Sequence, residues 1–118
     1  MLKVLLIEND LDVLNRMTRR LENSYQVLSF TNSREGKRHF IKFSPDIVII
    51  ATDSIEVDIY HICKDIKSDM QISNVKIIVT STSFIQPELF ERYCDAYMIK
   101  PFKIKNFLKI ITDVQLKR

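Results

Sequence analysis

The sequence predicts an α/β sandwich in which helices cover both faces of a parallel β-sheet. Short runs of Val, Ile and Leu alternate along the chain with longer segments whose apolar residues follow helical spacing. The strand-like runs show little alternation of apolar and polar residues, which is typical of strands buried on both faces. Five such strand–helix units fill the 118 residues, so we expect a single small domain over 1–118.

Each expected strand is a compact apolar run followed by a polar or turn-forming segment. In chain order these runs are 2–7, 25–30, 46–51, 75–80 and 96–99. The helices between them are identified by apolar residues three or four positions apart. The stripes are Leu11, Leu14, Thr18 and Leu21, then Gly36, Phe40 and Phe43, then Ile59, Ile62, Cys63 and Ile66, and finally Ile104, Leu108 and Ile111.

The composition is that of a soluble globular domain, with 46% hydrophobic and 28% charged residues. The apolar strand runs are far shorter than the ~20 residues that cross a bilayer. Glu8 interrupts the apolar start, which argues against a signal peptide. We therefore expect a cytoplasmic protein that does not enter a membrane.

Cysteine, histidine and basic residues show no pattern of a metal or nucleic-acid site. Cys63 and Cys94 have no C-x-x-C spacing and are expected to be reduced thiols. His39 and His61 also lack metal-type spacing, and we expect them on solvated helix faces. The net charge of +3 comes from scattered residues without a recognition helix or stacking motif. Nucleic-acid binding by this domain is therefore not expected.

The residues at the ends of the expected strands follow a specific order. The chain has an acidic turn after the first strand, an alanine ending the third, a threonine ending the fourth and a Lys-Pro pair after the fifth. This order resembles the receiver domain of two-component response regulators, CheY-like proteins, over essentially the whole chain. The resemblance implies a flavodoxin-like (βα)5 fold with strand order 2-1-3-4-5. The residues that carry it are Glu8, Asn9, Ala51, Thr80, Lys100 and Pro101.

The strand order implied by the resemblance brings these residues to the topological switch point, where open α/β sheets bind ligands. In receivers an aspartate at the position of Ala51 takes the phosphoryl group, and acidic groups hold Mg²⁺ beside it. Here a methyl group replaces the nucleophile, and Asn9 replaces a direct metal ligand that is normally Asp. Glu8 alone keeps its charge, so we expect no useful metal site, no cofactor and no enzymatic activity.

The other half of the receiver pocket is retained. The resemblance assigns Thr80 to the hydroxyl that binds the phosphoryl group, Lys100 to the lysine that pairs with that group, and Tyr97 to the switch aromatic. Pro101 matches a proline that follows a cis peptide bond in the family. With the acceptor aspartate gone, a buried and unpaired lysine would be costly, so we expect Lys100 to pair with Glu8. The alternative is a lysine that extends into water.

A second carboxylate near position 51 offers a different function. Asp53 is two residues beyond Ala51 and would be an alternative phosphoacceptor if the loop shifted. A surface position for Asp53 is favoured, because the resemblance gives this position only a backbone role. Asp58 matches an acidic residue of the family's loop motif, whereas Ile55 and Ile59 replace its usual Pro and Gly. The competing hypothesis is thus a working phosphoacceptor, through Asp53 or through an aspartate restored at position 51.

Receivers signal through a face built from the fourth helix, the fifth strand and the fifth helix. The segment between the last two strands is rich in apolar residues that span more than one helical face. Together with nearby lysines they predict an apolar patch with a basic rim that binds a protein partner or a second copy. Deeper burial of this helix is the alternative. The predicted face comprises Phe84, Ile85, Leu89, Phe90, Tyr93, Tyr97, Lys103 and Lys105.

The sequence thus predicts a pseudo-receiver, a protein-interaction module on a receiver scaffold without phosphotransfer. Two independent departures, at Asn9 and Ala51, favour natural degeneration over a single engineered substitution. A nucleotide site is not expected, because the only glycine, Gly36, lies in a predicted helix and forms no phosphate loop. In the family, linkers to output domains begin near Val114, so the chain is also consistent with a fragment of a longer protein.

Overall fold

The computed structural model describes residues 1–51, 59–68, 74–82 and 94–116, with the backbone alone for 59–62. Within these ranges the strands are β1 (Lys3–Ile7), β2 (Gln26–Phe30), β3 (Ile47–Ala51), β4 (Lys76–Ser81) and β5 (Ala96–Ile99). The helices are α1 (Leu11–Leu21), α2 (Ser33–Phe43), α3 (Ile59–Ser68) and α5 (Ile104–Gln115). Each predicted strand is present within one residue of its expected bounds.

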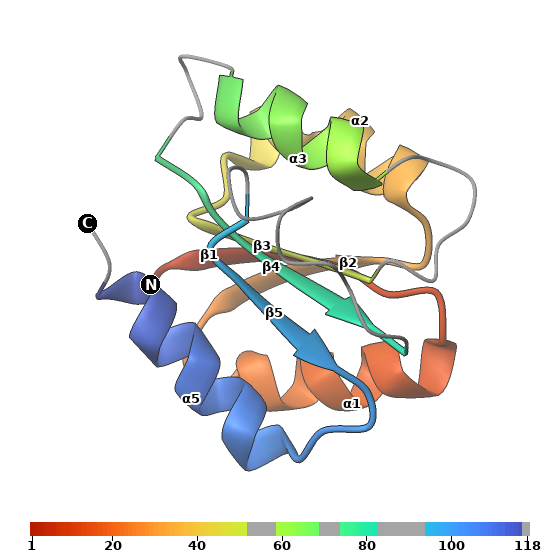
Figure 1. Ribbon diagram of the computed structural model, residues 1–118, viewed down its shortest axis with the longest axis vertical. Coiled ribbons are helices and arrows are strands. Elements are labelled where there is room, and N and C mark those ends of the chain that lie inside the picture. Colours follow the sequence, from red (N-terminus) through yellow and green to blue (C-terminus); the bar gives the residue numbers. More distant parts are fainter. Residues whose placement is uncertain (52–58, 69–73, 83–93, 117–118) are drawn as a thin grey trace.

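The strands form one parallel sheet in the order β2-β1-β3-β4-β5, as the resemblance implied. Helices α2 and α3 cover one face of this sheet, and α1 and α5 cover the other (Figure 1). Alternating residues of the central strands belong to two separate hydrophobic cores. Leu5, Val48 and Ile77 pack on the α2–α3 side. Val4, Ile49 and Ile78 pack on the α1–α5 side. The doubly wound sandwich is therefore confirmed.

Burial of the strands depends on their place in the sheet. The central strands β1, β3 and β4 are buried over nearly their whole length, as their apolar runs indicated. The edge strands are not: β2 is mostly half-buried, and β5 alternates between half-buried and exposed residues. The expectation that all five strands are buried on both faces was wrong for the two edges, because an edge strand has only one neighbour.

The apolar stripes of α1 and α5 are confirmed in part, since Leu14, Leu21 and Ile111 are buried as expected. Leu11, taken as a core position of α1, is 59% exposed, whereas Met17 is buried. Asp10 caps the helix directly before Leu11, so this leucine lies in the first turn, at the rim of the sheet. In α5 the fully buried residues are Phe107 and Ile111, and the expected Ile104 and Leu108 only flank them.

Gly36 explains how α2 approaches the sheet. It is buried, and a β-carbon at this position would lie 2.5 Å from Cδ1 of Ile7 on β1. That distance is far below an ordinary van der Waals contact. A side chain at position 36 would therefore require Ile7 or the helix to move.

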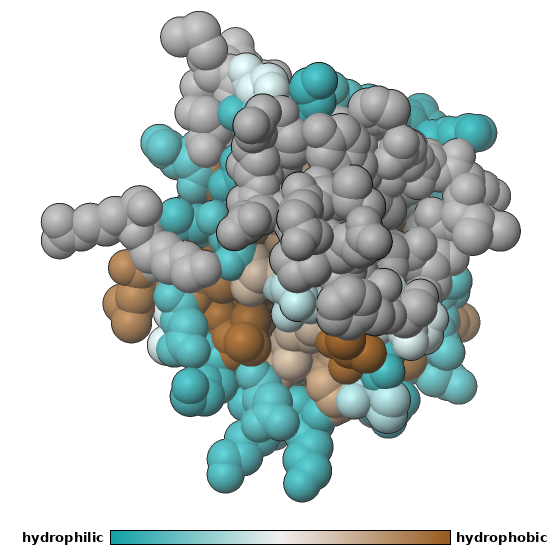
Figure 2. All heavy atoms as spheres, viewed as in Figure 1, coloured by the Kyte–Doolittle hydropathy of each residue, from teal (hydrophilic) through white to brown (hydrophobic). Residues whose placement is uncertain are grey.

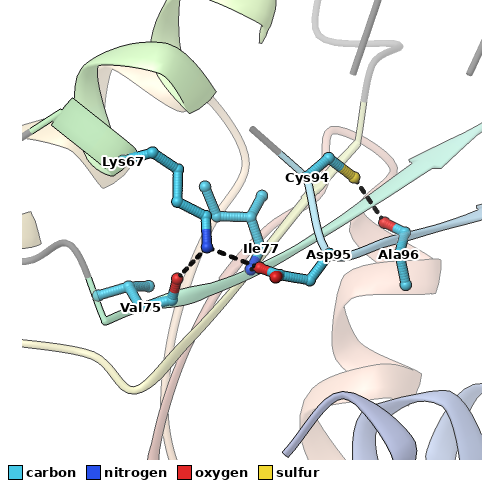
Figure 3. A network of polar contacts seen from close by, with 6 residues as sticks. All are labelled: Lys67, Val75, Ile77, Cys94, Asp95 and Ala96. Carbon is cyan, nitrogen blue, oxygen red and sulfur yellow. Dashed lines mark hydrogen bonds and ion pairs between the residues drawn. The ribbon is translucent and has the colours of Figure 1, made fainter. Parts of the chain in front are cut away.

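A partly buried ion pair connects α3 to the starts of β4 and β5 (Figure 3). The Lys67 ammonium donates to Asp95 Oδ2 at 2.8 Å and to the Val75 carbonyl at 2.7 Å. The same Asp95 oxygen accepts the backbone N–H of Ile77 at 2.8 Å. Both charged side chains are less than one-fifth exposed. Because this network lies at the amino-terminal end of the strands, it is remote from the candidate site.

Cys63 is buried, Cys94 is half-buried, and both are free thiols, as expected. The Cys94 thiol donates to the Ala96 carbonyl at 2.8 Å (Figure 3). Burial is the main cause that raises the pKa of Cys94 from 9.0 to about 11. His39 is exposed and stacks on Phe30 with ring centroids 4.8 Å apart. No helix in the described ranges has the length and apolar character that crossing a membrane requires.

Candidate functional site

The strand register places the predicted pocket residues at one edge of the sheet. Ala51 is directly opposite Thr80 in the β3–β4 pairing. Ile7 pairs with Ile50, so Glu8 follows β1 at the level of Ala51. On the other side, the Lys100 N–H donates to the Ser81 carbonyl at 2.6 Å. Residues far apart in the sequence therefore meet at the carboxyl ends of β1, β3, β4 and β5 (Figure 1).

This edge is closed to solvent at its centre. Ala51 is 0% exposed, and Glu8 and Thr80 are each 1% exposed. A carboxylate at this depth needs a charged or hydrogen-bonding partner, since an isolated buried charge is very unfavourable. The chemistry of the site therefore depends on what contacts Glu8.

Lys100 and the α1 turn both contact the Glu8 carboxylate. The Lys100 Nζ lies 2.5 Å from Glu8 Oε1, and its side chain is 14% exposed. The other oxygen, Oε2, accepts the backbone N–H of Asp10 at 3.0 Å. The expected Lys100–Glu8 ion pair is thus confirmed. The alternative in which Lys100 extends into water does not describe this arrangement, since its side chain is only 14% exposed.

The acidic turn after β1 contributes one carboxylate to the pocket. Asn9 and Asp10 are both exposed. Oδ1 of Asp10 accepts the backbone N–H groups of Asp12 and Val13 at 3.0 and 3.2 Å, which makes Asp10 the N-cap of α1. This capping role was missed from the sequence, although Asp directly before an apolar helical stripe is a known start signal.

The described pocket residues do not fit a divalent cation. Mg²⁺ requires hard oxygen ligands, usually including carboxylates. Glu8 is already held by Lys100 and by the Asp10 N–H, and Ala51 offers no side-chain oxygen. Asn9, the remaining candidate of this turn, is neutral. Elsewhere in the described ranges, no three His, Cys, Asp or Glu side chains gather as a group that could hold a metal.

Two further residues named by the receiver resemblance lie at the end of the sheet. The Lys100–Pro101 peptide bond is cis, as expected. Tyr97, the expected switch aromatic, is 37% exposed on β5. Its neighbour two positions on, Ile99, is 43% exposed and was not predicted as a surface residue. Both residues share one face of the edge strand β5, because side chains alternate along a strand.

Only part of the predicted partner face can be placed. Tyr97, Lys103 and Lys105 are exposed, at β5 and at the start of α5. The apolar members of the predicted patch lie outside the described residues, as do Asp53, Ile55 and Asp58. These outside members are Phe84, Ile85, Leu89, Phe90 and Tyr93.

Comparison with known proteins places the fold among receivers. The chain is 31% identical to the sensory transduction protein BceR of Halalkalibacterium halodurans over 119 aligned residues. That alignment includes 98% of this chain and 49% of BceR, so the chain spans about half the length of this relative. No family model matches the chain.

Solved receiver structures superpose on nearly the whole chain. The chemotaxis response regulator CheY4 of Vibrio cholerae has a TM-score of 0.87 at 20% identity, covering 97% of this chain and 98% of that one. The signal receiver domain of a DNA-binding response regulator from Colwellia psychrerythraea also has a TM-score of 0.87 at 20% identity, over 99% and 100% of the two chains. The chain therefore has the CheY-like receiver fold.

Proposed function

We propose that the chain is a receiver domain of two-component signal transduction that takes no phosphoryl group at position 51. The observation that carries the proposal is the fully buried methyl group of Ala51 at the centre of the pocket. Receivers have their acceptor carboxylate at the matching position. A methyl group supplies neither a nucleophilic oxygen nor a metal ligand. The receiver fold and the similarity to BceR support a role in signalling.

The Lys100–Glu8 pair supports a pocket held in one state. In receivers the lysine pairs with the acceptor or the bound phosphoryl group, so its position reports the phosphorylation state. Here the Lys100 ammonium is paired with the buried Glu8 carboxylate. Because Glu8 is not a phosphoacceptor, phosphoryl transfer would not take this partner away. We infer that the pair keeps the domain in a single conformation. Its signal then depends on whether a partner is bound, and the domain itself catalyses no reaction.

Exposed residues around β5 favour contact with another protein. Tyr97 and Ile99 form an apolar pair on the edge strand. Lys103 and Lys105 add exposed positive charge at the start of α5. An apolar centre with a charged rim is the usual organisation of a protein interface. The proposed occupant of this face is a protein partner or a second copy of the chain.

Intact-mass spectrometry after incubation with acetyl phosphate and Mg²⁺ tests the loss of phosphotransfer. The native chain is expected to keep its mass. Three matched samples accompany it: Ala51→Asp, Asp53→Asn and a conventional receiver as the reagent control. An adduct on the native chain that disappears in Asp53→Asn would overturn the proposal in favour of phosphorylation at Asp53.

The interaction face has a separate test. If the face joins two copies, light scattering after gel filtration will give a dimer mass for the native chain and a monomer mass for Ile99→Ser. Leu11→Ser, at an exposed apolar residue on α1, is the matched control and should leave the mass unchanged. A monomeric native chain would direct the proposal to a different protein as the partner.

A further inference from the structure

Helix α2 presents a stripe of positive charge to solvent. Residues three or four positions apart lie on one side of a helix, and on α2 such a series is exposed along the whole outer side. Four cationic residues against one acidic residue give the helix a net charge of +3, which equals the net charge of the entire chain. The residues of this α2 stripe are Arg34, Lys37, Arg38, Ile41 and Lys42.

The spacing of the charges in the α2 stripe is unfavourable for the helix alone. Arg34 and Arg38 are four residues apart, as are Arg38 and Lys42, so like charges lie one above the other. Arg34 is also in the first turn, where the helix dipole favours negative charge. Glu35 offsets only one of these charges, through an ion pair of 3.0 Å between its Oε1 and Nη1 of Arg38. An anionic surface laid along the stripe would relieve the remaining repulsion.

An exposed isoleucine lies among these cations. Ile41 is 55% exposed and follows Lys37 by one helical turn. Both residues line the mouth of an open pocket between α2, α3 and the sheet, together with Asp65 of α3. The floor residues Leu5 and Val48 are 0% exposed, so a partner would contact the mouth of the pocket and not its floor. The stripe therefore offers one apolar contact in a cationic surround.

Two features of the stripe favour a protein over a nucleic acid as its occupant. Ile41 has no group that binds a phosphate, whereas it can pack against an apolar side chain. Asp65 Oδ2 lies 3.7 Å from Lys37 Nζ, which brings a carboxylate to the edge of the stripe. That carboxylate would repel a phosphate backbone. A protein surface can instead combine carboxylates for the cations with a hydrogen-bond donor for Asp65.

We propose that the α2 stripe binds an acidic segment of a protein partner, with carboxylates against its cations and one apolar side chain against Ile41. From Arg34 to Lys42 the stripe extends about 12 Å, which matches two turns of a partner helix. Helix α2 packs over β1 and β2, at the opposite edge of the sheet from β5 (Figure 1). The stripe is thus separate from the proposed β5 face, and it does not depend on the loss of phosphotransfer.

Titration of the ¹⁵N-labelled chain with a synthetic acidic peptide tests the proposal. The probe is a short helical peptide with glutamates and one leucine on the same side, and its counterpart has glutamines in place of the glutamates. The acidic peptide should shift the amide signals of α2 in a saturable way. The glutamine peptide should bind at least tenfold more weakly, and added salt should weaken the binding of the acidic peptide only.

Charge removal from two helices shows whether the position of the cations matters. Arg34→Gln combined with Lys37→Gln should weaken binding of the acidic peptide about tenfold, as the loss of two surface ion pairs allows. Arg16→Gln combined with Arg19→Gln is the matched control. These two arginines are exposed on α1, have the same spacing, and their removal lowers the net charge equally. The control variant should bind the acidic peptide as tightly as the native chain.

The apolar contact has its own matched pair of variants. Ile41→Ser should weaken binding of the acidic peptide about fivefold, because the leucine of the peptide loses its apolar neighbour. Leu11→Ser is the control, since Leu11 is 59% exposed on α1 and Ile41 is 55% exposed on α2. It should leave the affinity unchanged.

Three results would overturn the proposal. Equal weakening by the charge variants of α1 and α2 would mean that binding depends on net charge alone. Peptide-induced shifts at α1 or β5 in place of α2 would move the site elsewhere. A short DNA duplex that saturates the α2 signals at lower concentration than the acidic peptide, at physiological salt, would make a nucleic acid the occupant.

Discussion

A double-mutant cycle on Glu8 and Lys100 measures how strongly the ion pair holds the pocket. Glu8→Gln removes the negative charge and keeps the shape, and Lys100→Met removes the ammonium and keeps most of the apolar stem. Each single variant leaves one charge facing a neutral side chain in a pocket where Glu8 is 1% exposed. Both should unfold at lower urea concentration than the native chain.

The expected size follows from the geometry. Two unit charges 2.5 Å apart attract by about 7 kcal/mol at an effective dielectric constant near 20. Desolvation of both groups offsets much of this gain, so removing one partner of a buried pair costs about 3–5 kcal/mol. Lys100 is 14% exposed and can regain some water, which favours the lower end, about 3 kcal/mol for each single variant.

The double variant distinguishes pairing from simple loss of packing. It leaves no unpaired charge, so we expect a cost of about 4 kcal/mol where independent effects would give about 6, a coupling of about 2 kcal/mol. Lys109 and Asp113 supply a matched control pair 3.4 Å apart, with side chains 77% and 52% exposed. Their coupling should be below about 0.5 kcal/mol.

Urea denaturation followed by circular dichroism gives the free energies of unfolding of the native chain and the six variants. The slope against denaturant must stay constant among the variants, because a change would indicate an altered unfolded state. Additive single effects at Glu8 and Lys100 would refute the reasoning. The ion pair would then contribute nothing beyond packing, and the inference of a pocket held in one state would lose its physical basis.

Three further predictions concern other parts of the chain. Asp95→Ala should lower the free energy of unfolding by about 2–4 kcal/mol in urea denaturation, because it leaves the Lys67 ammonium and the Ile77 N–H without their buried acceptor; a cost near zero would contradict this. Because the folded-state pKa of Cys94, about 11, lies above the ordinary 9.0, stability should be lost as pH rises from 9.0 towards 11, and thermal melts of Cys94→Ala should lack this component. Asp10→Ala should cost about 1 kcal/mol by removing the α1 cap, whereas Asp10→Asn should cost less, as chemical denaturation can show.

The strands could be predicted from the sequence because each is a continuous apolar run. Apolar runs of strand length located β1, β3 and β4 with bounds within one residue. The order of the strands came from the resemblance to receivers, since periodicity does not specify which strands are neighbours. Helical stripes were less reliable: Leu11 follows the spacing of α1 but is exposed, because the spacing does not show where the sheet beneath a helix ends.

The Lys100–Glu8 ion pair of the candidate site could be predicted from the sequence, because only one counterion was expected near Lys100. Glu8 was the sole carboxylate expected in the pocket, so the loss of Asp at position 51 left Lys100 with one possible counterion, and the structure has that pair. The pocket between α2, α3 and the sheet gave no sequence signal, because its lining comes from four elements that only packing brings together.

The ion pair of Glu8 and Lys100 also bears on which side chains position 51 can accept. An aspartate placed at position 51 would enter a fully buried site where the Lys100 ammonium already has a carboxylate partner. Two carboxylates would then share one cation, which raises the free energy of the folded state. Ala51→Asp alone is therefore expected to be less stable than the native chain, so the pair itself favours an uncharged side chain at position 51.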